Sequence, residues 1–202
     1  MSDLKNLVVI RHASAEHEKT EMGGWTDTGL EAEGEAEAIK AGEEIPKDVK
    51  GIVTSDLERA VETAKIISKE TGIPILEQSS SLRSWNMGKF AGKDPKKIEP
   101  ILDDLAEHHP NESTDDGESF NHYKNRFLKG VEAIIKKYKG KKIAILTHSH
   151  GTRILRGWEA KGCPSDLSID MKEYNRKPMP NGGVDEVQGK KLSRLTSETK
   201  ES

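Results

Sequence analysis

The residues of this sequence that could do chemistry are cationic side chains that follow short apolar runs. Arg11 and His12 follow the first run, Arg59 comes soon after the second, and His148 follows a later one, with Arg153 five residues further on. A guanidinium group can donate two parallel hydrogen bonds to two oxygens of a phosphate, and an imidazole nitrogen can attack phosphorus as a nucleophile. We therefore expect a phosphate site in which neutral His12 attacks, while the arginines and protonated His148 stabilise the transferring phosphoryl group.

The apolar runs are expected to be the strands that position these side chains. Residues 7–10, 51–55 and 142–147 are rich in β-branched residues, which suit a buried strand. A further run, residues 72–76, contains Pro74, which favours an edge position or the start of a strand. Parallel strands place their carboxyl ends on one side of a sheet, so the cationic groups should converge there.

The segments between these runs have apolar residues at helical spacing. The expected helices cover residues 31–44, 60–70, 96–107, 120–138 and 152–160. Ser55 or Asp56 is expected to cap the helix that begins at residue 60, because either side chain can accept from free N–H groups of the first turn. Strands that alternate with helices predict an α/β fold, a three-layer α/β/α sandwich with a mostly parallel sheet.

The chain is expected to form one domain over residues 1–195. Residues 78–118 interrupt the alternation, are polar and contain three prolines, so we interpret them as a crossover or cap segment that could cover a pocket. Residues 184–187 and 192–195 are expected to pair as a small hairpin. The polar tail, residues 196–202, is expected to be disordered.

The composition argues against several classes of partner. A net charge of −3, with basic and acidic residues interleaved, disfavours a general nucleic-acid or membrane-surface binder. No apolar run reaches the roughly 18 residues that span a bilayer, and no signal peptide is recognised at the N-terminus. The single Cys163 excludes an internal disulfide framework. We expect a cytoplasmic protein with a small phosphorylated substrate and no nucleic-acid or membrane partner; the oligomeric state is not indicated.

Five short motifs occur in a fixed order along the chain. They are residues 7–13, residues 30–38, residues 55–64, the Gly-Glu-Ser at 117–119 with Asp116 before it and Arg126 after it, and Thr147 and His148 followed by Arg153. This ordered set resembles the histidine phosphatase superfamily, which includes the cofactor-dependent phosphoglycerate mutases. The resemblance implies a phosphoglycerate mutase-like fold and a phosphohistidine intermediate on His12, with Arg11, Arg59 and His148 completing the phosphate pocket.

Two positions depart from the family pattern. Ala13 stands where glycine is usual, and Ser84 stands where many members have a glutamate that protonates the leaving group. Serine is a poor proton donor at neutral pH, so either another acid acts or the leaving group needs little help. Glu118 is the first candidate for that acid and Asp116 the second, although an acid there would also stabilise a helix N-terminus.

Two histidines compete in the last motif. We assign the catalytic role to His148, because it follows the strand directly and has an arginine five residues further on. His150 is expected to line the rim of the substrate pocket, and Ser84 is expected to contact the substrate as well.

The expected activity is that of a metal-independent phosphatase of the histidine acid phosphatase type, which hydrolyses a phosphomonoester without a cofactor. Two alternatives stay open: phosphoglycerate mutase-type phosphoryl transfer, and a catalytically weak phosphate-binding module, which Ser84 would permit. The short chain and the missing glutamate count against a mutase. Histidines with no cysteine and no obvious carboxylate partner make a poor zinc site. The substrate is not indicated.

Overall fold

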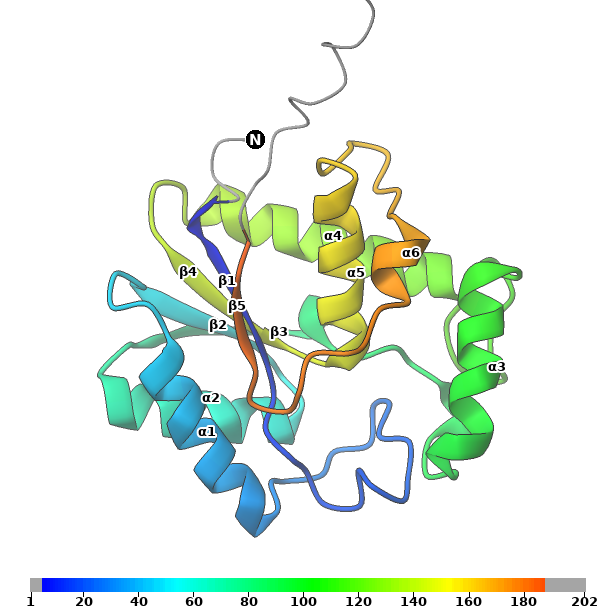
Figure 1. Cartoon of the computed structure of the whole chain (residues 1–202), viewed down its shortest axis with the longest axis horizontal. Coiled ribbons are helices and arrows are strands. Elements are labelled where there is room, and N and C mark those ends of the chain that lie inside the picture. The colour runs from blue at the N-terminus through cyan, green and yellow to red at the C-terminus, as the bar shows by residue number, and fades with distance from the viewer. Residues whose placement is uncertain (1–4, 188–202) are drawn as a thin grey trace, which may run out of the picture.

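A five-stranded sheet runs through the centre of the protein (Figure 1). The computed structural model describes residues 5–187. The strands are β1 (Leu7–Arg11), β2 (Gly51–Ser55), β3 (Ile75–Ser79), β4 (Ile143–Thr147) and β5 (Val184–Glu186). They lie in the order β3-β2-β4-β1-β5, in which β1 to β4 are parallel and β5 is antiparallel to β1. The predicted mostly parallel sheet is confirmed.

Helices cover both faces of this sheet, which confirms the three-layer α/β/α sandwich. They are α1 (Ala32–Glu44), α2 (Glu58–Thr71), α3 (Pro95–Glu107), α4 (Phe120–Lys137), α5 (Ser149–Ala160) and α6 (Met171–Tyr174). Side chains of β1 alternate between the two layers, as the pleat of a strand requires. Val8 and Ile10 pack with α1 and α2, whereas Leu7 and Val9 belong to the larger apolar cluster that includes α4 and α5.

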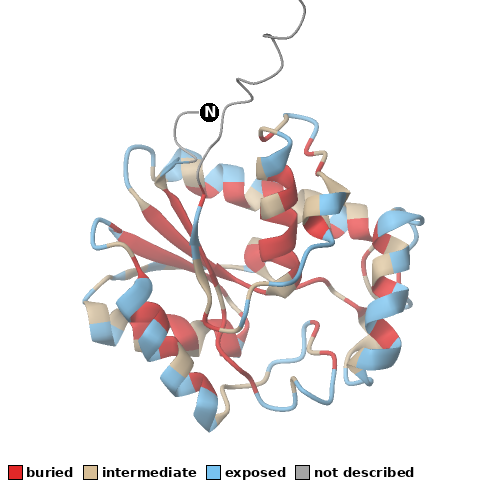
Figure 2. Cartoon of the chain, viewed as in Figure 1, coloured by how far each residue is buried: buried red, intermediate tan, exposed pale blue. Residues whose placement is uncertain are grey.

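The central strands are buried along their length (Figure 2). Every residue of β2 and β4 is buried, while β3 alternates between half-buried and exposed residues and forms one edge of the sheet. Parallel strands covered on both faces have nearly continuous apolar sequences, which is why these runs could be recognised. The edge position favoured by Pro74 is confirmed.

The carboxyl ends of β1, β2 and β4 meet at one edge of the sheet. Arg11 at the end of β1 lies opposite Thr147 at the end of β4, and Thr54 near the end of β2 lies opposite Leu146. The residues that follow these strands therefore emerge side by side. This register brings the loop after β1, the start of α2 and the start of α5 to the same place.

Two predicted elements begin three residues away from their expected starts. The third strand begins at Ile75 and not at Gly72, because Gly72 ends α2 in the left-handed conformation, with φ 73°. The last predicted helix begins at Ser149, three residues before the expected start. His150 consequently lies in the first turn of α5.

The predicted cap of α2 was wrong. The N-cap residue is Leu57, and its side chain makes no capping hydrogen bond. Asp27, from the loop after β1, accepts instead from the Glu58 N–H at 2.7 Å. Ser55 accepts a long hydrogen bond from the Leu57 N–H at 3.4 Å and lies beside His148. A carboxylate distant in sequence therefore ties the loop after β1 to α2.

The C-terminal part of the described chain returns to the edge of β1. The first strand of the predicted hairpin is β5, which pairs with β1. The predicted second strand, residues 192–195, and the tail, residues 196–202, lie outside the described residues. Between residues 5 and 187, no helix combines the length and the apolar character needed to cross a bilayer.

Candidate active site

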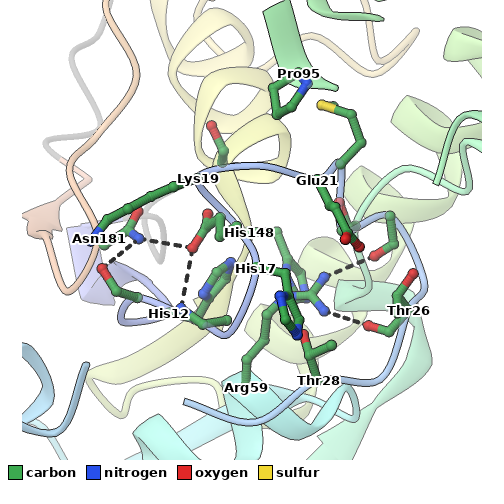
Figure 3. Close-up of a pocket in the computed structure, with 18 of the residues that line it drawn as sticks. His12, His17, Lys19, Glu21, Thr26, Thr28, Arg59, Pro95, His148 and Asn181 are labelled. Carbon is green, nitrogen blue, oxygen red and sulfur yellow. Dashed lines mark hydrogen bonds between the residues drawn. The ribbon is translucent and has the colours of Figure 1, made fainter. Parts of the chain in front are cut away.

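A cavity of about 280 Å³ lies at the carboxyl edge of the sheet (Figure 3). Its walls come from the loop after β1, the first turn of α2, the segment after β3, the start of α3, the start of α5 and the segment before β5. Six of the predicted site residues line it: Arg11, His12, Arg59, Ser84, His148 and His150. The convergence expected from parallel strands thus brings these side chains together.

His12 lies in the cavity wall with one ring nitrogen fixed. Its Nδ1 is 2.7 Å from the carbonyl oxygen of Ala13, which can only accept, so Nδ1 carries the hydrogen and Nε2 keeps a lone pair. Burial is the main reason that the pKa of His12 falls to about 3; the Glu18 charge opposes this, and the guanidiniums of Arg59 and Arg11 add to it. His12 is therefore a neutral imidazole with a free nitrogen.

Arg59 is held by backbone carbonyls of the loop after β1. Its Nη1 donates to the oxygen of Thr26 at 2.7 Å and its Nη2 to the oxygen of Gly24 at 2.8 Å (Figure 3). Burial lowers its pKa to about 10, so the side chain stays charged near neutral pH. Because neither carbonyl bears a charge, the guanidinium charge is available to an anion in the cavity.

Arg11 reaches the cavity between a carboxylate and a carbonyl. Its Nη2 donates to Oε1 of Glu18 at 2.6 Å, and its Nη1 donates to the oxygen of Met179 at 2.8 Å. Within residues 5–187, its buried Nε has no hydrogen-bond partner. The ion pair with Glu18 means that one of the two guanidiniums already has a counter-charge.

His148 stands beside the nucleophile candidate. Its ring centroid is 5.0 Å from that of His12, and its Nε2 is 2.9 Å from Oγ of Ser55. Burial, with the charge of Arg59 second, holds the pKa of His148 well below its ordinary value. The neutral form is favoured, unlike the protonated form that the sequence suggested; a phosphate dianion would shift this balance toward the charged form.

Both sequence candidates for the proton donor lie elsewhere. The carboxylate of Glu118 is buried against Arg126, whose Nη2 donates to it at 2.6 Å, and accepts from the Asn86 N–H at 3.0 Å. Asp116 is exposed beside Lys89. Neither is among the described residues that line the cavity. The structure therefore does not bring Glu118 or Asp116 to the cavity in which the leaving group would lie.

Glu118 has a positioning role that explains its burial. Arg126, which pairs with it, also donates to the backbone oxygens of Ser81 at 3.0 Å and Ser84 at 3.0 Å. Trp25 donates to the Ser84 oxygen at 2.8 Å. These contacts fix the segment that carries Ser84 against the cavity, so the Gly-Glu-Ser motif supports the site from behind.

Arg153 is the one member of the predicted cationic set that faces away. Its Nε donates to the oxygen of Tyr174 at 2.9 Å, and its Nη2 pairs with Asp103 at 3.1 Å. It lies within α5, where the helical twist turns it toward α3 and α6. His150, close to the start of the same helix, lines the cavity and packs edge-on against Trp85, with ring centroids 5.7 Å apart.

The sequence did not reveal every side chain of the cavity. Glu18 and Asn181 line it and contact each other, with Nδ2 of Asn181 donating to Oε2 of Glu18 at 2.9 Å. Both lie in irregular segments, whose contacts follow no periodicity. The one sequence feature that could have placed Glu18 in the cavity is its position only six residues after His12. Within the described part of the chain, no three His, Cys, Asp or Glu side chains are grouped to hold a metal ion.

The fold and cavity together define an α/β protein with a cavity lined by histidine and arginine at the carboxyl edge of a mostly parallel sheet. The chain belongs to the histidine phosphatase superfamily (branch 1), whose sequence profile matches residues 7–179. This confirms the family that the ordered motifs suggested.

Relatives of this chain carry two kinds of name. It is 27% identical over 176 residues to the phosphoglycerate mutase-like protein 4 of Arabidopsis thaliana, covering 83% of this chain and 75% of that one. It is 26% identical over 158 residues to the metal-independent phosphoserine phosphatase of the same plant, covering 73% and 65%. A mycobacterial glucosyl-3-phosphoglycerate phosphatase has the same fold, with a TM-score of 0.72, 21% identity and coverage of 88% and 90%.

Proposed function

We propose that this protein is a phosphomonoesterase that works through a phosphohistidine on His12. The observation that carries the proposal is the fixed tautomer of His12, whose Nδ1 is bound to a carbonyl and whose Nε2 stays free beside two guanidiniums. In the first step, Nε2 attacks phosphorus and the ester oxygen leaves. In the second step, water attacks the phosphohistidine and releases phosphate.

Each cationic side chain has a role in these steps. Arg59 and Arg11 bind the non-bridging oxygens and stabilise the charge of the transferring group. The charge of the dianion raises the pKa of His148, next to His12, so that this imidazole takes a proton from water and donates from both ring nitrogens. Ser84 and His150 form the wall that the rest of the substrate contacts.

Trapping the intermediate tests the proposal. Mixing the protein with a ³²P-labelled phosphomonoester and quenching in base should give labelled protein whose label is lost in acid, as expected for phosphohistidine. His12→Ala should lose the label and reduce turnover by at least about 10⁴-fold, because no covalent path remains. His108→Ala, at an exposed residue that ends α3, should behave like the wild type. Turnover near the wild-type level in His12→Ala would refute the phosphohistidine mechanism.

The second candidate function is transfer of the phosphoryl group within a phosphoglycerate, which the name of the mutase-like relative favours. The products distinguish the two functions. A phosphatase releases inorganic phosphate from 3-phosphoglycerate, whereas a mutase gives the 2-phospho isomer without stoichiometric phosphate release. We expect phosphate release, which the name of the metal-independent phosphoserine phosphatase relative favours. A protein that binds phosphate but neither labels nor turns over would be a binding module.

A further inference from the structure

The cavity contains a carboxylate that the resemblance to the family did not identify. Glu18 points from the loop after β1 into the same space as His12 and Arg11. Its Oε1 accepts from Arg11 at 2.6 Å, and its Oε2 accepts from Asn181 at 2.9 Å and from the Ala15 N–H at 3.3 Å. Placing a negative charge in an anion site costs binding energy, so its presence calls for a role.

The backbone is bent to bring this carboxylate back to the nucleophile. His17, directly before Glu18, has φ 62°, a conformation that a residue with a side chain rarely adopts. Its carbonyl accepts from the N–H groups of Thr20 at 2.9 Å and Glu21 at 2.8 Å, which holds the turn. This local strain lets the chain reverse after His12, so that Glu18 returns to Arg11.

We propose that Glu18 is the proton donor and acceptor of the reaction, in the role for which Ser84 is unsuited. This inference rests on the proposed phosphatase function. In the first step, the His12 Nε2–P bond forms and the P–O ester bond breaks, while the Glu18 proton passes to the leaving oxygen. In the second step, the water O–P bond forms and the N–P bond breaks, and Glu18 takes a proton from that water. Each turnover therefore restores the proton that it uses.

The charges around Glu18 explain how one carboxyl group can be the proton donor in the first step and the proton acceptor in the second. Burial alone would raise the pKa of Glu18, but the charge and hydrogen bond of Arg11 and the N–H of Ala15 lower it, so the group is ionised before substrate binds. A phosphate that enters the cavity accepts the hydrogen bond that Arg11 otherwise donates to Glu18. It also brings a second negative charge close to the Glu18 carboxylate. Both changes raise the pKa of the carboxyl, which then takes a proton from water.

The other acids of the cavity are less suited to this role. Glu16, Glu21 and Glu99 also line the cavity, but none of them has a hydrogen bond or ion pair with Arg11 or Arg59 in the described structure. Glu31 pairs with Lys19 at 3.2 Å. Among the described carboxylates of the cavity, Glu18 is the one whose charge raises the pKa of both His12 and Arg59. Its carboxylate also faces Arg11 directly.

The test compares phosphate esters that differ in their need for an acid. Phenolate ions leave easily, whereas alkoxides need a proton. In Glu18→Gln, single-turnover cleavage of glycerol 2-phosphate should fall by about 100-fold or more, while cleavage of p-nitrophenyl phosphate should fall by less than about tenfold. In Glu18→Ala, added formate should restore the alkyl rate without changing the aryl rate.

Two control variants complete the design. Glu35→Gln, on the exposed side of α1 and outside the cavity, should leave both rates unchanged. Glu99→Gln removes a competing cavity carboxylate and should leave the ratio of alkyl to aryl rates unchanged. Equal losses on both esters in Glu18→Gln, or a selective loss in Glu99→Gln instead, would overturn the assignment of Glu18. Absence of labelling and turnover in the wild-type protein would overturn the proposed function itself.

Discussion

His12, His148 and His150 are buried imidazoles in one cavity wall, and burial is the main cause that lowers the pKa of each. The pKa of His150 falls to about 3. An unfolded chain would protonate these side chains below about pH 6.5, whereas the folded protein keeps them neutral well below that pH. The unfolded state therefore binds more protons, and folding loses stability as the pH falls from 6.5 toward 3.

We expect the free energy of unfolding to decrease between pH 6 and pH 4. His150→Gln should reduce the slope of that decrease by about 1.4 kcal/mol per pH unit, since one fewer proton is taken up on unfolding. Urea denaturation at several pH values measures this slope. His108→Gln, in which the replaced side chain is exposed, should keep the wild-type slope. An unchanged slope in His150→Gln would show that His150 is protonated in the folded state.

Residues of the site could be predicted when they directly followed a strand or opened a helix, because sheet topology alone brings such positions together. Arg11, His12 and His148 are of this kind. Glu118 was expected at the cavity because its residue type suits an acid, whereas the direction of its side chain depends on Arg126. Glu18 could not be placed, since a strained turn, rather than any repeat, returns it to the cavity.

At the scale of elements, hydrogen bonds at the start of α2 hold the loop after β1 beside the candidate site. Asp27 accepts from the Glu58 N–H, and the nearby carbonyls of Gly24 and Thr26 hold Arg59. The loop and the helix are therefore fixed to each other by two sets of contacts. The sequence predicted the helix but assigned its cap to neighbouring residues, because long-range caps leave no local pattern.

Asp27→Ala should destabilise the protein by about 1 kcal/mol, the usual cost of losing a helix cap. It should also weaken the binding of inorganic phosphate, because the loop that orients Arg59 is loosened. Urea unfolding and phosphate titration by calorimetry measure the two effects. Asp48→Ala, which removes an exposed partner of Lys142, should leave phosphate affinity unchanged. Wild-type affinity in Asp27→Ala would mean that Arg59 is oriented without the loop.

Most elements were predictable because the sheet is covered on both faces. Its strands are short continuous apolar runs, and the helices have one apolar face. The third strand was misplaced because the chain first completes α2 with Gly72 in a left-handed turn. The start of α5 was missed because its N-cap is His148, a residue type that is not a usual N-cap and that makes no capping hydrogen bond here.

At the scale of the whole molecule, the positive charge of the site comes from side chains of the chain itself. Arg11 ends β1, Arg59 lies in the first turn of α2, and both line the cavity. We expect activity toward phosphomonoesters to be unchanged by dialysis against EDTA, because the two guanidiniums supply the electrostatic stabilisation. Measuring the rate before and after dialysis tests this. A loss that zinc restores would revive the metal-site alternative.

The segment before β5 has a consequence for how the protein acquires activity during synthesis. Met179 binds Arg11, Asn181 binds Glu18, and the Gly182 N–H donates to the His12 oxygen at 3.2 Å. These partners are separated from the first strand by more than 160 residues. A ribosome makes residues 179–182 after the four parallel strands, so the nascent chain can build those strands before these contacts close the cavity. Docking of residues 179–182 against the first strand and the loop after it would then be the step that completes the candidate site.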